Sequence, residues 1–326
     1  MAPTTATKKT ARIKIGAEAV QNIAILFVFA ILCLVGFILE PQLFFTTGNI
    51  TNILVSSSSV IIVASAVTLV IITGNLDLSV AGVGAMGAVL FAVFARAGVP
   101  VLTSAALAVL CGLICGFLNG FIISKLSLPS FIISLAFKFI AGGVALIGAE
   151  GAIISFGLPG NIGIIGQTIS GVPLPVVYAM IVFLIFLFIQ NKTVFARQCY
   201  AIGANITTAK LSGINSVKVI TGVYALSGML AAFAGVVITS RFTVADSGIL
   251  PGFEADVIIA AVLGGTNING GRGTVFGTLI GALIVVVLTN ITNMLGMEIY
   301  TQNMLKGFVL IFAILLNQTI QKFIKV

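Results

Sequence analysis

The ionisable residues of this chain limit the chemistry that it can perform. Its 326 residues include eight Asp and Glu, sixteen Lys and Arg, and no histidine. This set is too sparse to supply a base-activated nucleophile or a zinc site. The sequence also has no G-x4-G-K-[ST] phosphate loop and no Gly-Lys dipeptide. We therefore predict no catalytic residue, no metal and no cofactor in this chain, and no ATP hydrolysis by it.

Asp77, flanked by Asn75 and Ser79, stands between two apolar segments. A carboxylate in this position can accept hydrogen bonds from N–H groups at the start of a helix. The same three side chains can also line a path and exchange hydrogen bonds with a polar solute. A cap that faces water would serve both purposes, so both interpretations stay open.

Glu254 and Asp256 follow a Pro-Gly pair at the start of another apolar segment. Two carboxylates in the first turn of a helix suit its macrodipole and need no other role. Their i, i+2 spacing directs them to different sides of a helix, so we do not expect a catalytic carboxylate pair.

Lys138 lies inside the apolar run 131–140, where a buried ammonium group is costly. We expect it to face a cavity or to pair with a carboxylate, for which Asp77 and Asp256 are the candidates. The alternative is that its side chain extends to the membrane interface.

The composition identifies the class of protein. Apolar residues make up 59% of the chain, charged residues make up 7%, and the mean hydropathy is +1.25. This balance is typical of an all-α polytopic membrane protein. At about 20 residues a span, ten spans use roughly 200 residues and leave no room for a soluble domain of ordinary size. We predict about ten spans, at 21–39, 53–73, 79–95, 102–124, 131–149, 174–190, 219–240, 254–268, 274–295 and 303–321.

The cations predict the orientation of these spans. With ten spans, most of the sixteen Lys and Arg fall on the side of the N-terminus, and the positive-inside rule makes that side cytoplasmic. We therefore predict a basic cytoplasmic segment over 1–20 and a single transmembrane domain over 21–326, with both termini inside. Spans two to five and seven to ten are five crossings apart, an odd offset that would make any repeat inverted in the membrane.

Glycine and amide residues organise the apolar segments. Spacings of four residues, at 112, 116 and 120 and at 273, 277 and 281, predict close helix packing. Polar, glycine-rich breaks at 73–79 and at 264–273, which contains Asn267, are candidates for lining a path. Asn119, Asn290 and Asn293 lie in apolar segments and favour hydrogen bonds between helices, with contact to a solute as the alternative for each.

The longest polar interval, 191–218, carries a quarter of the cations. A short helix that docks on a partner needs breakers at its edges, an apolar ridge and cations at the rim. The interval supplies all three, with Gly203 and Gly213 as breakers, Ile206, Leu211 and Ile214 as the ridge, and Arg197, Lys210 and Lys218 at the rim. A positive-inside anchor without a partner is the alternative.

Five blocks carry a resemblance to a known family. They are FFTTGNITNIL at 44–54, GNLDLSVA at 74–81, FLNGFIISK at 117–125, AIGANITTAKLSGIN at 201–215, and the most specific, GFEADVIIAAVLGGTNINGGRGTVFGTLIGALI at 252–284. In this order they resemble the membrane subunit of ribose/xylose/arabinose-type ABC sugar importers, from about residue 44 to the C-terminus.

The resemblance implies a type II importer fold, similar to the vitamin B12 importer permeases. It implies a homodimer, or a pair with a related permease, in the bacterial inner membrane. It also implies a cytoplasmic ABC ATPase, which holds ATP and Mg, and a periplasmic or lipid-anchored sugar-binding protein. In such permeases the interval between spans six and seven sits on the ATPase, and the matching residues here are Gly203, Asn205, Leu211, Ser212, Gly213 and Ile214. The resemblance also implies a role for Glu254 and Asp256 at the outer mouth or in a gate. The family often has an acidic residue near Thr207 and an arginine near Ala141, and this chain has neither.

We therefore interpret the chain as an importer permease that moves a monosaccharide or related small polar solute by alternating access. The alternative is a stand-alone secondary transporter with Asp77, Asp256 and Lys138 as an ion relay, and a passive channel would leave the interval 191–218 unexplained. The cations are spread over several loops and suit membrane lipids, not nucleic acid.

Overall fold

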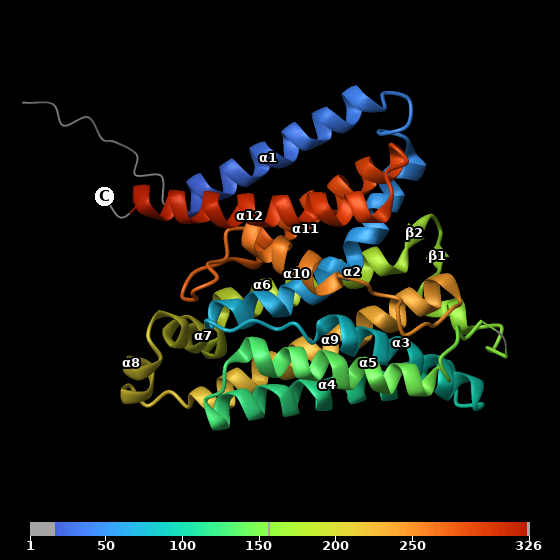
Figure 1. Ribbon diagram of the computed structural model, residues 1–326, viewed down its shortest axis with the longest axis horizontal. Helices are drawn as coiled ribbons and strands as arrows, with labels where there is room; N and C mark the ends of the chain where they lie inside the picture. The colour runs from blue at the N-terminus through green and yellow to red at the C-terminus, as the bar shows by residue number, and fades with distance from the viewer. Residues whose placement is uncertain (1–16, 156, 325–326) are drawn as a thin grey trace, which may run out of the picture.

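We describe the protein from a computed structural model, which covers the backbone of residues 17–155 and 157–324 and the side chains of 24–155 and 157–311. Most of the predicted N-terminal segment 1–20 therefore lies outside the described residues. The described chain is a bundle of α-helices (Figure 1). Their bounds are α1 Ala17–Leu39, α2 Thr47–Ile72, α3 Val80–Arg96, α4 Val101–Leu126, α5 Ser130–Gly148, α6 Leu174–Lys192, α7 Val194–Ala204, α8 Ile206–Leu211, α9 Ser216–Phe242, α10 Phe253–Leu263, α11 Val275–Met294 and α12 Ile299–Ile324.

The segment between α5 and α6 has its own small structure. It contains a 3-10 helix, Ile162–Ile165, and a hairpin of two short antiparallel strands, β1 Thr168–Ile169 and β2 Val172–Pro173. An isolated backbone bridge joins Ile154 to Ala245, beyond the end of α9. The sequence analysis did not predict these elements.

Helix α2 forms the centre of the bundle. Residues 57–72 of this helix are buried on every side, as expected for a helix surrounded by others. The hydroxyls of Ser57, Ser58, Ser65 and Thr68 each donate to the carbonyl oxygen four residues earlier. This pairing lets hydroxyl groups enter the apolar interior without losing a hydrogen bond.

The glycine ladder on α4 packs directly against α9. A Cβ atom added to Gly116 would lie 2.2 Å from the Tyr224 carbonyl oxygen, and one added to Gly112 would lie 2.3 Å from the Ala232 Cβ. On α11, a Cβ atom at Gly281 would lie 2.0 Å from the Ala260 carbonyl oxygen of α10. The predicted close packing at both ladders is confirmed.

We expect Gly116→Ala to destabilise the protein by about 1–3 kcal/mol, because the backbone that its methyl group meets cannot rotate away. Gly307→Ala in α12 is the matched control, since nothing lies within 4 Å of its added Cβ. Thermal unfolding of both variants in detergent, followed by circular dichroism, checks this. Equal midpoints for the two would contradict the packing assignment.

The outside of the bundle is apolar. Large apolar side chains are exposed along α4, α5 and α6, among them Leu102, Phe139, Ile147 and Phe188. Six described helices, α2, α4, α5, α6, α9 and α11, are long and apolar enough to cross a membrane, and α3 and the described part of α1 are shorter apolar helices. The chain is a multi-pass membrane protein.

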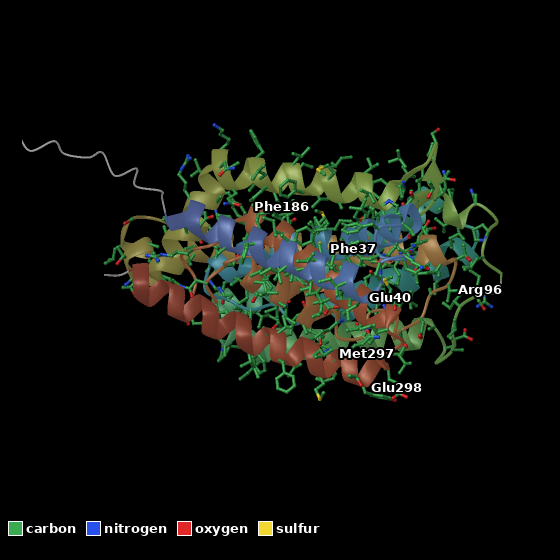
Figure 2. The ribbon with its side chains drawn as sticks, turned by 90° about the horizontal axis from the view of Figure 1, so that it is seen from above. Phe37, Glu40, Arg96, Phe186, Met297 and Glu298 are labelled. Carbon is green, nitrogen blue, oxygen red and sulfur yellow. The ribbon has the colours of Figure 1, made fainter. Side chains whose placement is uncertain are left out.

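All ten segments predicted as spans overlap helices. The least regular is the segment predicted at 254–268. Its helix, α10, ends at Leu263 because Gly264-Gly265 turns the chain into the predicted break, where Gly265 has φ +89°. The labelled residues Glu40, Arg96 and Glu298 lie in the half of the molecule away from α7 and α8 (Figure 2).

Candidate functional site

Asp77 is buried between α2 and α3, at the first predicted break. Its Oδ1 accepts hydrogen bonds from the Ser79 backbone N at 2.9 Å and the Ser79 Oγ at 2.5 Å, and its Oδ2 accepts from the Ser227 Oγ of α9 at 2.6 Å. Asn119 of α4 donates to the Ser79 Oγ at 3.2 Å. Asp77, Ser79, Ser227 and Asn119 are all at most 1% exposed. The network ties the break to α4 and α9.

The backbone at this break is also satisfied by side chains. The Leu76 carbonyl oxygen accepts from the Tyr224 Oη at 2.8 Å and from the Ser134 Oγ at 3.3 Å. The Leu76 backbone N–H donates to the Ser130 Oγ at 3.1 Å. Asn75 Nδ2 donates to the Thr73 Oγ1 at 3.0 Å. Irregular backbone at membrane depth requires such partners, and they come from α5 and α9.

The structure bears out the capping interpretation of Asp77 only for the residue that precedes α3. The carboxylate holds the N–H of Ser79, the residue that precedes α3, and not the N–H groups of the first helical turn. The Asn119 amide links α4 to the break, as expected for a polar group between helices. A role for these side chains along a path stays a prediction.

Two ion pairs fix the start of α10. Lys138 of α5 pairs with Glu254 Oε1, and the Lys306 Nζ of α12 lies 2.8 Å from the Asp256 Oδ1 and 2.9 Å from its Oδ2. The two carboxylates point to opposite neighbours, as their spacing predicted. The predicted partners of Lys138, Asp77 and Asp256, are wrong, because serines bind the first and Lys306 binds the second.

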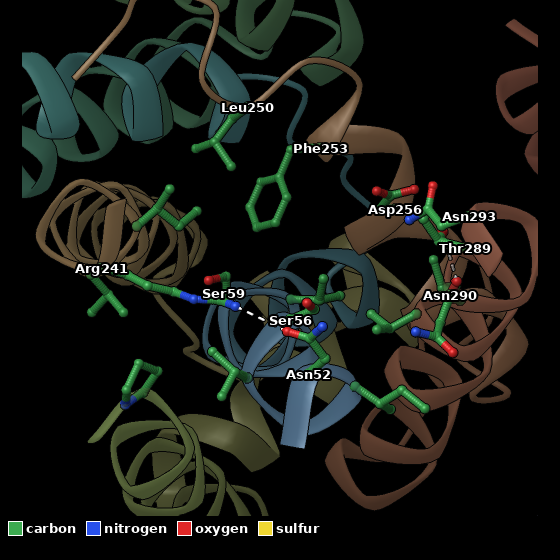
Figure 3. Close-up of a pocket in the computed structure, with 18 of the residues that line it drawn as sticks. Asn52, Ser56, Ser59, Arg241, Leu250, Phe253, Asp256, Thr289, Asn290 and Asn293 are labelled. Atoms are coloured by element: carbon green, nitrogen blue, oxygen red, sulfur yellow. Dashed lines mark hydrogen bonds between the residues drawn. The ribbon is translucent and has the colours of Figure 1, made fainter. Parts of the chain in front are cut away.

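A cavity of about 540 Å³ opens between α2, α9, α10 and α11. Polar side chains line it from three helices, as Figure 3 shows for Asn52, Ser56 and Ser59 of α2, Arg241 of α9, and Thr289, Asn290 and Asn293 of α11. Leu250 and Phe253 cover one side, and Asp256 lies at the edge near α11. A cavity lined by amide, hydroxyl and apolar side chains is suited to bind a small neutral polyol.

Hydrogen bonds hold the polar wall of this cavity. The Arg241 Nη2 donates to the Asn52 Oδ1 at 3.3 Å. Asn49 and Asn290 exchange two amide hydrogen bonds, at 2.8 and 3.1 Å, and so join α2 to α11. The Asn293 Oδ1 accepts from the Gln302 Nε2 at 2.7 Å. The interpretation of Asn290 as a link between helices is confirmed.

Most residues of this cavity were not predicted from the sequence. A usable signal was present, because Asn52, Ser56 and Ser59 follow the i, i+4, i+7 spacing of one helical face. Of the predicted path residues, Asp256 lines this cavity, while Lys138 and Glu254 line a smaller one of about 310 Å³ beside α3 and α5. Asn267 lies away from both, in the α10–α11 loop, where its Oδ1 accepts from the Asn269 backbone N.

The interval 191–218 forms two short helices, α7 and α8, as its docking interpretation requires. Side-chain caps mark the starts of the helices here: the Thr193 Oγ1 accepts from the Ala196 N at 3.3 Å at α7, the Asn205 Oδ1 from the Thr208 N at 2.9 Å at α8, and the Asn215 Oδ1 from the Lys218 N at 3.0 Å at α9. Gly213, with φ +82°, reverses the chain after α8. The Ser212 Oγ donates to the Thr208 carbonyl oxygen and closes the last turn.

Helix α8 exposes apolar side chains, and exposed cations lie on it and on the neighbouring parts of α7 and α9. Leu211 is 85% exposed and Ile206 is 43% exposed, while Ile214 is half-buried. The cations Arg197, Lys210 and Lys218 are exposed around them. An exposed leucine of this kind on a polar end of the bundle is suited to a protein partner.

Gly203 differs from its predicted role as a breaker. It lies inside the last turn of α7, and a Cβ atom there would be 1.8 Å from the Ile72 carbonyl oxygen. Close approach of backbones, not helix termination, is the reason for glycine at this position.

Comparison with known proteins gives a family and several relatives. Residues 49–314 match the family described as the permease component of branched-chain amino acid transport systems. The ribose import permease protein of Escherichia coli is 37% identical over 88% of this chain and 91% of its own length. The ribose import permease protein of Haemophilus influenzae is 33% identical over 94% and 96%. The D-allose transport system permease protein of Escherichia coli is 33% identical over 91% of each. No solved structure matches the chain.

Proposed function

We propose a sugar-importing function for this chain, which belongs to the family described as the permease component of branched-chain amino acid transport systems. The observation that carries the proposal is the similarity, at 33% identity or more over nearly the whole chain, to permeases named for ribose and allose. The substrate is then a monosaccharide or a related small polar solute, although the family description names amino acids.

The chemistry of the larger cavity favours a neutral polyol over an amino acid. Its polar lining consists mainly of amides and hydroxyls, which match sugar hydroxyls as both donors and acceptors. The carboxylate at its edge, Asp256, is already held by Lys306 and is less available for an ammonium group. We propose that the solute passes this cavity and is bound there only weakly, so that selectivity lies mainly in the binding protein.

The proposed arrangement has ten crossings, with both termini in the cytoplasm of a bacterial inner membrane. Helix α10 together with the loop 264–273 forms the eighth crossing, because the helix alone has only eleven residues. Two copies of the chain, or one copy and a related permease, assemble in the membrane. The cations of α7 and α8 then lie on the cytoplasmic side, in accord with the positive-inside rule.

In this proposal the energy comes from a partner. A cytoplasmic ABC ATPase, which holds Mg and ATP, docks on α7 and α8, and a sugar-binding protein delivers the solute to the other face. Nucleotide-driven movement of α7 and α8 alternately opens the path to each side. The predicted path residues Asn75, Asp77, Ser79 and Asn267 lie in the breaks that would move, and Asn119 contacts the first break through Ser79. The pairs of Glu254 with Lys138 and Asp256 with Lys306 act as gates at the start of α10.

The contacts do not favour the secondary-transport alternative. Asp77, Lys138 and Asp256 belong to three separate networks, with serines, Glu254 and Lys306 respectively. A relay needs neighbouring groups between which an ion can pass. The similarity to ABC permeases supports the same conclusion.

Uptake by vesicles that contain the chain, its ATPase and its binding protein tests the substrate. We expect ATP-dependent accumulation of labelled ribose or allose that excess unlabelled leucine does not reduce. Leucine uptake with no effect of sugars would overturn the assignment of a sugar and leave an amino acid permease in its place.

A further inference from the structure

We propose that four glycines form a joint through which α7 moves the membrane helices; this inference rests on the proposed function. The glycine joint consists of Gly203 on α7, Gly74 at the end of α2, and Gly270 and Gly271 in the α10–α11 loop. It joins the docking segment to both predicted breaks at one point (Figure 1, at the α7 end of the molecule). These glycines are positioning residues for transport.

Backbones meet in this joint without side chains between them. A Cβ atom added to Gly203 would lie 1.8 Å from the Ile72 carbonyl oxygen and 2.5 Å from the Gly271 N. One added to Gly270 would lie 2.8 Å from the Gly74 N and 3.1 Å from the Gly203 Cα. Three segments that are far apart in the sequence therefore touch directly, and none can shift far without moving the others.

Hydrogen bonds fasten the same three segments. The Gly271 N donates to the Ile72 carbonyl oxygen at 2.9 Å and so holds the end of α2. The Tyr200 Oη, one turn before Gly203, donates to the Gly273 carbonyl oxygen at 2.7 Å. Helix α7 thus holds the α10–α11 loop at two places, through Tyr200 and through Gly203. The Gln190 Oε1 of α6 accepts from the Val275 N at 2.7 Å and anchors the start of α11.

Gly270 and Gly271 require glycine for a second reason. Their φ angles are +85° and +75°, in the left-handed region that other residues rarely adopt. Gly203 is helical, so only the lack of space excludes a side chain there. A substitution at Gly203 therefore disturbs the joint without weakening the helix that carries it.

The joint connects the docking surface to the larger cavity. The two elements that it holds are the end of α2 and the loop that follows α10. At their other ends, α2 supplies Asn52, Ser56 and Ser59 to the cavity, and α10 supplies Phe253 and Asp256. A displacement of α7 acts on both walls of the cavity through rigid helices, whereas the exposed end of α8 is free to contact a partner.

The rate at which Cys199 is chemically labelled can test the glycine joint without a transport assay. It lies on α7, next to Tyr200, and is 0% exposed, and burial raises the pKa of its thiol to about 12. A thiol with such a pKa reacts slowly with maleimides while α7 is seated. In a chain that keeps only this cysteine, the rate of labelling measures how often α7 leaves the joint.

Gly203→Ala tests the inference, with Gly48→Ala, at the open first turn of α2, as the matched control. In the purified chain alone we expect the alanine at Gly203 to raise Cys199 labelling severalfold, and the control to leave it unchanged. In the full complex we expect sugar uptake per ATP hydrolysed to fall by about tenfold while hydrolysis continues. If Gly203→Ala equals Gly48→Ala both in the rate of Cys199 labelling and in uptake per ATP, the proposed glycine joint is refuted.

Tyr200→Phe is a second variant that tests the same inference if Gly203→Ala does not fold. It removes the hydroxyl that donates to the Gly273 carbonyl oxygen and leaves Gly203 unchanged, so we expect a smaller rise in Cys199 labelling and a smaller loss of uptake per ATP. Unchanged labelling in a folded Tyr200→Phe chain would contradict the joint. Because labelling needs no partner, increased labelling in a chain that proves not to use ATP would refute the proposed function and leave the contact intact.

Discussion

Replacement of Leu211 by glutamate abolishes ATP-driven uptake while the permease remains folded in the membrane; this is the largest effect that we expect. Leu211 is 85% exposed at the end of α8, so the change costs the isolated chain little. In the proposed complex the same side chain is buried against the ATPase, where an unpaired carboxylate is costly. We expect uptake to fall by about a hundredfold, in line with loss of a central interface residue. Co-purification of the ATPase with the membrane subunit measures docking directly.

Thr207→Glu is the matched control for this change. It puts the same charge on the same short helix, but in the first turn, where a carboxylate suits the macrodipole. Relatives suggested by the sequence resemblance often carry an acidic residue near this position, so we expect uptake to be retained. If Leu211→Glu transports as well as Thr207→Glu, α8 is not the docking site.

Removal of the Asp77 carboxylate is the second change with a large expected effect. In Asp77→Ala the buried hydroxyls of Ser79 and Ser227 lose their common acceptor. Each unsatisfied buried group costs about 1–3 kcal/mol, so we expect a loss of roughly 3 kcal/mol in stability. The midpoint of thermal unfolding in detergent measures it, with the insertion level as a check.

Asp77→Asn separates the structural role from a role in transport. The amide keeps one acceptor for Ser79, and a serine hydroxyl can accept from its Nδ2, so we expect a loss of only about 1 kcal/mol. If capping and bridging are the whole role of Asp77, uptake stays near that of the unchanged chain. Normal stability with no uptake would show that Asp77 acts along the path.

The positions of the helices could be predicted well from the sequence. Long apolar segments leave few choices in a membrane, because every backbone group must be satisfied within the segment. Glycine spacing also predicted where helices pack, as at Gly116 against Tyr224. The two breaks and the polar interval 191–218 could be predicted because polar and glycine-rich stretches interrupt the apolar segments.

The partners of the charged residues could not be predicted in the same way. Lys138 and Glu254 are 116 residues apart, and only the approach of α5 to the start of α10 brings them together. Gly203 has a local sequence typical of a breaker, yet its role depends on Ile72 and Gly271. The hairpin between α5 and α6 was missed because each of its strands has two residues, too few to show an alternating pattern. Such features depend on contacts between distant segments, which spacing along the chain does not encode.

Reconstitution into sealed vesicles tests most directly whether this chain depends on a separate energy source. The account predicts that the purified chain alone accumulates no sugar under a proton or sodium gradient. It predicts accumulation when the ABC ATPase, the binding protein and ATP are supplied together, and none when a non-hydrolysable nucleotide replaces ATP. Uphill accumulation by the chain alone, driven by an ion gradient, would contradict it.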